Sequence, residues 1–190
     1  MTGKPSSKTL DQYKALTEGI GFRELPQRVQ IRLTGADRST FLHGLCTNDV
    51  QALQPGQGCE AFLTNVQGKI SGFVYIFCAS DALVLDSTGQ TGSDIVAGMD
   101  RYLIREDVQL HDLSQTRREW LVAGKSASDW LKTRFGSATL SQPFAHAVVE
   151  LECRQLSLRR VPYAGSDSYF IDADQGAGDL LVETMHDDGL

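Results

Sequence analysis

Apolar and polar residues follow two blocks of the same order along the chain, and each block predicts strands that alternate with helices. Apolar runs bounded by turn-forming residues predict the strands, and apolar residues at helical spacing predict the helices. The first block predicts a strand over 31–34, a helix, strands over 59–64, 69–78 and 82–86, a helix over 92–104, and a closing strand over 108–113. The second block predicts a strand over 119–123, a helix over 126–135, strands over 146–151, 155–161 and 168–171, and a helix over 176–187.

The predicted order is therefore β-α-β-β-β-α-β followed by β-α-β-β-β-α. Short turns between strands indicate antiparallel hairpins, and helices must cover one face of each sheet, so the expected fold class is α+β. We expect a lead with a short helix over 1–21, a first unit over 22–114 and a second unit over 115–190. No predicted strand closes the second block, so the second unit should end with an unpaired strand edge.

The two blocks are also related residue by residue. The segment 31–42 matches the segment 120–131 in residue class at a constant offset of 89 residues. Gly35 and Gly124 occupy the turn after the strand in the two copies. Asp37 and Ser126 follow, where each side chain is expected to cap the next helix. The match indicates an internal repeat, and the alternative is that it reflects only two generic strand–turn–helix units.

The charge balance makes some partners poor candidates. The chain has 18 Lys and Arg against 24 Asp and Glu, which gives a formal net charge of −6 and a sequence pI near 5.2. Nucleic acids and anionic membranes are bound mainly through Lys and Arg, so neither is an expected partner. Apolar residues make up 41% and charged residues 22% of the chain, which is ordinary for a globular protein.

Cysteine and histidine usage indicates neither a disulfide framework nor a metal site. The four cysteines form no C-x-x-C pair, so we expect reduced and mostly buried thiols. The four histidines are scattered, and no metal is predicted. The longest apolar stretch, 73–79, is far shorter than the roughly 20 residues that span a membrane. The segment 1–8 lacks the apolar run of a signal peptide, so we expect a cytoplasmic protein.

Few residue constellations suggest catalysis. The G-x-S-x-G, P-loop and G-x-G-x-x-G motifs do not occur in a suitable context. His43 and Cys46 lie near each other in sequence, but a catalytic Cys–His pair normally joins distant segments. Arg159 and Arg160 should point to opposite faces of a strand, so at most one of them can meet a given ligand. A solvated strand edge is the simpler interpretation of these arginines.

Several segments together carry a family resemblance. They are LTGADRSTFLHGLCTNDV at 33–50, FLTNVQGKI at 62–70, DRYLIR at 100–105, VQLHD at 108–112 and RVPYAG at 160–165. In this order they resemble the folate-binding superfamily of aminomethyltransferase T-proteins and YgfZ-type proteins, over most of residues 22–188. The resemblance implies two pseudo-symmetric α+β units that bind tetrahydrofolate. In the family a C-terminal β-barrel follows these units, and we expect this chain to lack it.

The chain differs from T-proteins at the positions that the resemblance connects with methylene transfer. T-proteins have a pair of aspartates after the hairpin, one of which supports methylene transfer, and the matching residues here are Gly72 and Phe73. A phenylalanine can neither orient an amine nor stabilise a cation, so the resemblance implies a domain without this chemistry and argues against an enzyme. A glutamate that grips the pterin in T-proteins corresponds to Phe170.

A flat pterin needs an apolar slot with one or two polar anchors. The resemblance and the residue types give four candidate folate contacts, which are Asn65, Asp86, Arg160 and Tyr163. Each also has a purely structural interpretation. Asn65 can be a turn residue, Asp86 can end its strand, Arg160 can lie at a solvated strand edge, and Tyr163 can pack at the turn of Pro162.

Overall the chain resembles the YgfZ branch, which is implicated in iron–sulfur cluster assembly or repair. This implies an accessory protein with a folate as ligand and iron–sulfur proteins as clients. The later Lys-Gly-Cys-Tyr-x-Gly-Gln-Glu signature of that branch does not occur in these 190 residues, so none of the four cysteines inherits its role. We therefore expect the N-terminal portion of a YgfZ-like protein. An aminomethyltransferase of the glycine cleavage system and a ligand-free domain are the alternatives.

Overall fold

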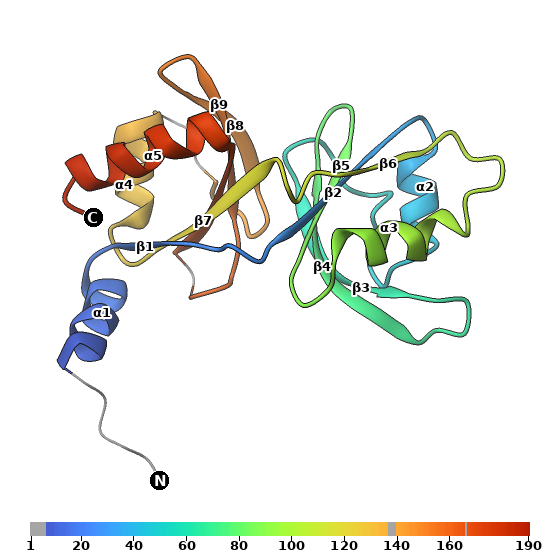
Figure 1. Cartoon of the computed structure of the whole chain (residues 1–190), viewed down its shortest axis with the longest axis horizontal. Coiled ribbons are helices and arrows are strands. Elements are labelled where there is room, and N and C mark those ends of the chain that lie inside the picture. The colour runs from blue at the N-terminus through green and yellow to red at the C-terminus, as the bar shows by residue number, and fades with distance from the viewer. Residues whose placement is uncertain (1–6, 137–139, 166) are drawn as a thin grey trace, which may run out of the picture. The chain divides into compact units, whose positions relative to one another are not determined.

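The computed structural model describes residues 7–136, 140–165 and 167–190. The described residues form two compact units, each built on a five-stranded sheet (Figure 1). Unit 1 comprises the chain up to Leu25 together with Glu119–Ser141 and Ala147–Leu190, and unit 2 comprises Pro26–Arg118 and Gln142–His146. The predicted α+β class is confirmed.

Unit 2 contains the first predicted block. Its elements are β2 (Val29–Thr34), α2 (Arg38–His43), β3 (Gly58–Thr64), β4 (Ile70–Cys78), β5 (Leu83–Ser87), α3 (Gly92–Asp100) and β6 (Gln109–Asp112). The strand order is β3-β4-β5-β2-β6, with antiparallel neighbours throughout. Alternate residues of these strands face α2 and α3, which contribute Phe41, Leu42, Ile95 and Met99 to one buried apolar cluster.

Unit 1 contains the second predicted block and the N-terminal elements. Its elements are α1 (Ser7–Glu18), β1 (Gly21–Glu24), β7 (Arg117–Ala123), α4 (Ala127–Phe135), β8 (His146–Leu151), β9 (Arg154–Arg160), β10 (Ser168–Asp174) and α5 (Gln175–Asp187). The strand order is β1-β7-β10-β9-β8. Helix α5 packs closely on this sheet, since a Cβ on Gly178 would lie 2.3 Å from the ring of the fully buried Trp120.

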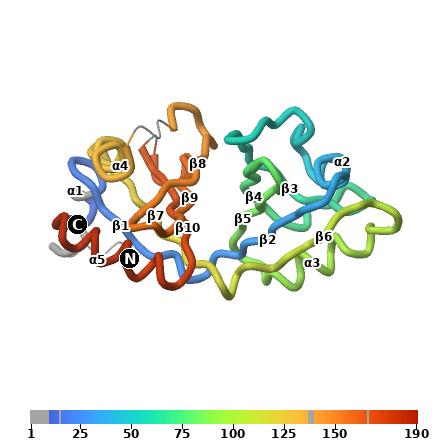
Figure 2. The backbone as a smooth tube through the Cα atoms, turned by 90° about the horizontal axis from the view of Figure 1, so that it is seen from above, coloured from blue at the N-terminus to red at the C-terminus, as the bar shows by residue number. Residues whose placement is uncertain are grey.

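The N-terminal strand β1 closes the sheet that was expected to have an open edge. β1 pairs antiparallel with β7, as β6 pairs with β2 in the other unit, and both pairings can be followed in Figure 2. The two strand orders are then equivalent position by position. The expected unpaired edge was wrong, because the strand that covers it comes from the start of the chain. Accordingly, the elements predicted as a separate lead over 1–21 belong to unit 1.

Gly35 and Gly124 allow the closing strands to approach. Both have positive φ angles, +103° and +126°. A Cβ on Gly35 would lie 2.0 Å from the carbonyl oxygen of Asp107, just before β6, and a Cβ on Gly124 would lie 2.3 Å from that of Gly19, just before β1. The same two carbonyls accept backbone hydrogen bonds from Asp37 and Ser126, at 3.2 and 3.1 Å. The repeat predicted from sequence therefore extends to individual backbone hydrogen bonds.

The predicted side-chain caps of α2 and α4 are absent. Neither Asp37 nor Ser126 makes a side-chain capping bond, and both have ψ near zero (4° and 0°) rather than the extended backbone that aims a cap at the helix. The Asp37 carboxylate instead accepts a hydrogen bond of 2.8 Å from the backbone N–H of Asp107. It therefore secures the segment that leads into β6.

Asp188 joins the ends of α4 and α5. Its carboxylate accepts hydrogen bonds from the indole N–H of Trp130 at 2.7 Å and from Nε of Arg134 at 3.1 Å, and Arg134 also forms an ion pair with it. These bonds favour the charged carboxylate, so they lower the pKa of Asp188 below its ordinary value. The ionised carboxylate thus stabilises the packing of the two helices.

Alanine at Gly124 should destabilise the fold far more than alanine at Gly136. Both glycines have positive φ, but the space around Gly136 is open and the new methyl group at Gly124 would overlap the Gly19 carbonyl. We expect Gly124→Ala to cost about 3 kcal/mol or more and Gly136→Ala about 1 kcal/mol. Urea denaturation measures both free energies of unfolding, and equal costs would contradict the role assigned to Gly124.

Asp188→Asn should destabilise the protein at neutral pH and make little difference in acid. Because the folded-state pKa is lowered, the carboxylate stabilises the fold above its unfolded pKa, near 3.8, and this contribution is lost as the pH falls through the folded pKa. Thermal unfolding between pH 7 and pH 2.5 measures the difference. Asp187→Asn makes the same charge change one residue away, and the pH dependence of its unfolding should match that of the wild type.

Candidate functional site

An aromatic ladder crosses the face of the unit 2 sheet opposite α2 and α3. Phe62 on β3 pairs in register with Phe73 on β4, and their ring centroids lie 5.5 Å apart. Tyr75 follows on the same face of β4, and its ring centroid lies 5.2 Å from that of Phe73. The ring centroid of Phe144 lies 6.0 Å from that of Tyr75. Phe62 and Phe73 keep 42% and 36% of their surface exposed. We name Phe62, Phe73 and Tyr75 the aromatic face.

A buried ion pair lies beside the aromatic face. Asp86 on β5 pairs in register with Tyr75, and its side chain is fully buried against the guanidinium of Arg28. The Arg28 Cζ atom also lies 5.8 Å from the centre of the Tyr75 ring, in the range of a cation–π contact. Asp86 therefore neutralises a buried arginine. Sequence reasoning missed Arg28, since nothing near it in the chain indicates a partner on β5.

Gly72 and Phe73, which the family resemblance matches to the T-protein aspartates, have distinct surroundings. A Cβ on Gly72 would lie 2.4 Å from Oε1 of Gln90, so the absence of a side chain at Gly72 makes room for the Gln90 amide. That amide donates a hydrogen bond to the backbone oxygen of Ser71. Phe73 lies in the centre of the aromatic face. Neither position offers a group that could take part in proton transfer or charge stabilisation.

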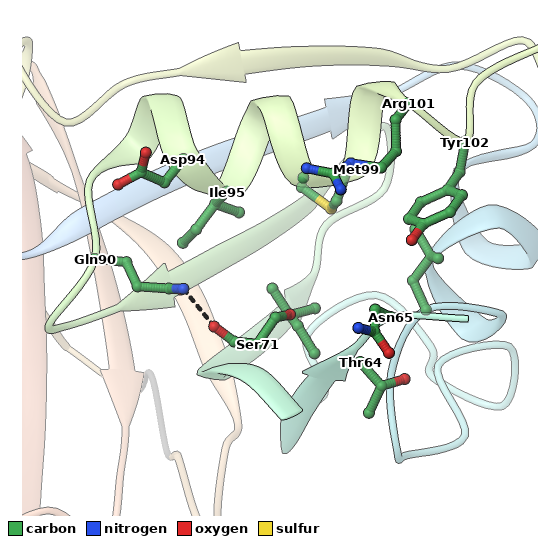
Figure 3. Close-up of a pocket in the computed structure, with 12 residues that line it drawn as sticks. Thr64, Asn65, Ser71, Gln90, Asp94, Ile95, Met99, Arg101 and Tyr102 are labelled. Atoms are coloured by element: carbon green, nitrogen blue, oxygen red, sulfur yellow. Dashed lines mark hydrogen bonds between the residues drawn. The ribbon is translucent and has the colours of Figure 1, made fainter. Parts of the chain in front are cut away.

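Asn65 has two roles. Its Oδ1 accepts hydrogen bonds of 3.0 Å from the backbone N–H groups of Gln67 and Lys69, so it forms the hairpin turn between β3 and β4. Its side chain also lines a cavity of about 220 Å³ between this hairpin and α3. Figure 3 shows Asn65 and Tyr102 pointing into this cavity from the side opposite Gln90.

The other two candidate residues lie in unit 1. Arg160 donates hydrogen bonds from Nη1 to the backbone oxygens of Leu140 and Ser141, at 3.0 and 2.6 Å, and its Nη2 lies 3.7 Å from the Asp167 carboxylate. Tyr163 is half exposed, and its ring centroid lies 5.3 Å from that of Phe170. The four candidates are thus divided, with Asn65 and Asp86 in unit 2 and Arg160 and Tyr163 in unit 1.

Arg159 and Arg160 point in opposite directions, as the strand alternation predicts. Arg159 is buried and bridges the carboxylates of Glu119 and Asp172, at 3.2 and 3.1 Å. The interpretation as a solvated strand edge was wrong, because β9 lies between β10 and β8 inside its sheet. Each unit therefore has a buried arginine held by carboxylates.

Three of the four cysteines have thiols that are harder to ionise than an ordinary cysteine. Burial raises the pKa of the Cys46 and Cys78 thiols, and raises that of Cys59 to about 11, so these thiols stay protonated at neutral pH. His43 faces Asp49, with Nδ1 3.4 Å from the carboxylate, and Cys46 is directed at the backbone oxygen of Asn48. Within the described residues, no three His, Cys, Asp or Glu side chains are grouped so that they could hold a metal. The described helices are too short or too polar to cross a membrane.

Comparison with known proteins agrees with the repeat and the fold. Residues 5–190 match the family model of the GCVT N-terminal domain. An aminomethyltransferase of Nostoc sp. is 23% identical over 188 residues, which cover 94% of this chain and 50% of that protein. The chain thus spans about half the length of this curated relative.

Two solved structures share the fold. The glycine cleavage system aminomethyltransferase T of Bartonella henselae superposes with a TM-score of 0.78 at 18% identity, over 92% of this chain and 47% of that one. A chain of the heterotetrameric sarcosine oxidase of Corynebacterium sp. U-96 superposes with a TM-score of 0.63 at 17% identity, over 95% of this chain and 92% of that one. The fold is that of the aminomethyltransferase superfamily. The chain belongs to the GCVT N-terminal domain family.

Removal of the Asp86 carboxylate should be costly, because it breaks a buried ion pair with Arg28. We expect Asp86→Asn to lower the free energy of unfolding by about 3 kcal/mol. Asp81→Asn is the matched control, since Asp81 pairs with Arg32 at the surface and should cost less than about 1 kcal/mol. Chemical denaturation of both variants tests this, and comparable costs would show that the buried pair is not important for stability.

Proposed function

We propose that this chain is a folate-binding domain that acts as an accessory factor and does not itself transfer a methylene group. The family membership supports an aminomethyltransferase-like domain, and folate is the ligand implied by the resemblance to that superfamily. The observation that carries the proposal is the aromatic face, in which Phe73 occupies a position that an aspartate takes in T-proteins.

The aromatic face suits a flat heterocycle. Rings such as Phe62 and Phe73 bind planar ligands through dispersion and ring quadrupoles, and they present no charge that could stabilise an iminium or orient an amine. Asn65 and Tyr163 are not assigned to the aromatic face in this proposal, because Asn65 lines the cavity between the β3–β4 hairpin and α3 and Tyr163 lies in unit 1. Asp86 and Arg160 are not assigned as polar anchors in this proposal, because each side chain is already bonded to protein groups.

The accessory role extends to iron–sulfur clusters. The sequence motifs resemble those of YgfZ-type proteins, which are implicated in iron–sulfur cluster assembly or repair. In this proposal the domain holds a folate, and iron–sulfur proteins are its clients.

A second candidate is a domain of an aminomethyltransferase of the glycine cleavage system. The similarity to the Nostoc and Bartonella proteins favours it. It requires a group that stabilises the transferred methylene unit, and Gly72 and Phe73 supply none. An assay of tetrahydrofolate-dependent methylene transfer separates the two candidates, because turnover would support this one and overturn the accessory role.

The folate claim is tested by titration calorimetry with 5-formyltetrahydrofolate. We expect saturable binding, and we expect Phe73→Ala and Phe62→Ala to weaken it about fivefold each, the size of one lost aromatic contact. Ile104→Ala is the matched control, since Ile104 is 83% exposed and lies outside the aromatic face. An absence of heat with the wild type would favour a ligand-free domain. Equal affinities for all four proteins would place the folate elsewhere.

A further inference from the structure

Helix α3 contains a glycine that the packing of the protein does not require. Gly98 lies inside the helix, where glycine is less favourable than alanine. A Cβ at Gly98 would meet no atom of the described residues within 4 Å, whereas a Cβ on Gly92 in the same helix would overlap the Asp112 carboxylate. Gly98 lines the cavity of about 220 Å³ between α3 and the β3–β4 hairpin. Its missing side chain therefore leaves space in that cavity.

One acidic and one basic side chain line this cavity, and the basic one is the more available to a ligand. Of its two charged side chains, Asp94 already accepts a hydrogen bond of 2.7 Å from the Thr91 hydroxyl. Arg101 makes one hydrogen bond within the described part of the chain, from Nε to the backbone oxygen of Ala97 at 3.4 Å, and it has no carboxylate partner there. Its two terminal amino groups can therefore form a bidentate pair with a carboxylate.

The other residues that line the cavity indicate which groups a ligand needs besides its carboxylate. Leu45, Leu63, Ile95 and Met99 supply apolar surface. Asn65 and Tyr102 bring polar groups from one side, and Gln90 lies opposite them (Figure 3). Oε1 of Gln90 is buried and has no hydrogen-bond donor within the described residues, whereas the Gln90 amide nitrogen donates to the backbone oxygen of Ser71. A ligand with a hydroxyl group would satisfy it.

We propose that this cavity binds a small organic acid with an apolar ring or chain, its carboxylate on Arg101 and a hydroxyl group on Gln90. The site lies on the helix-covered side of the unit 2 sheet, so it is separate from the aromatic face and independent of the proposed folate site. Gly98 acts in it as a specificity-determining residue, because any larger side chain there occupies the ligand's space.

The probe is 4-hydroxyphenylacetate, followed by ¹⁵N–¹H correlation spectra of the intact chain. We expect saturable shifts of the backbone amides of residues 63–65, 90 and 95–102. The neutral analogue 2-(4-hydroxyphenyl)ethanol has the same ring and hydroxyl group but no carboxylate, so we expect it to bind about tenfold more weakly. Arg101→Gln should weaken the binding of 4-hydroxyphenylacetate to a similar extent. If the acid and the alcohol bind equally, or if neither shifts these amides, the proposal is overturned.

Three variants of α3 distinguish filling of the cavity from damage to the helix. Gly98→Phe should abolish the shifts, and Ala97→Phe should leave them unchanged, since Ala97 is exposed on the same helix and does not line the cavity. Gly98→Ala should raise the melting temperature, which shows that the position tolerates a side chain in the fold. Retained binding in Gly98→Phe would overturn the site. Phe73→Ala should not alter it, so failure here and failure of the folate proposal are distinguishable.

Discussion

The fold depends on the contact between a glycine turn and the strand that closes each sheet. At Gly35 and at Gly124 a backbone carbonyl occupies the place of a Cβ, and the next residues donate hydrogen bonds to that carbonyl. This contact fixes where β6 and β1 enter their sheets, and the closed sheets then bury the cores under the helices. Because β1 precedes unit 2 in sequence and pairs in unit 1, unit 1 is not a continuous segment of the chain, and unit 2 is also discontinuous because it includes Gln142–His146.

The two faces of the unit 2 sheet present different side chains because residues alternate along each strand. Strand alternation sends aliphatic residues toward α2 and α3, and it sends Phe62, Phe73 and Tyr75 to the other side. The aromatic face presents exposed rings beside the buried Arg28–Asp86 pair. The cavity at Gly98 lies on the helix side, where the β3–β4 turn and α3 meet. One sheet can therefore support two separate ligand sites.

Most of the secondary structure was predictable, since its causes are local. The strand and helix positions, the repeat at an offset of 89 residues and the α+β class all follow from apolar periodicity and turn residues. The helix caps were predicted wrongly at Asp37 and Ser126, because the backbone there is not extended and the Asp37 carboxylate turns to a segment 70 residues away. A local sequence pattern does not indicate a hydrogen-bond partner that lies so far along the chain.

The sequence by itself determined the type and order of the elements in the two blocks and the repeat that relates them. Only the tertiary structure decided that β1 closes the second sheet, that Asp86 neutralises Arg28 and that Gly98 faces open space. The physical reason is the range of the interactions. Periodicity and turn chemistry act over a few residues, whereas strand pairing, buried charge compensation and cavities depend on residues that folding alone brings together.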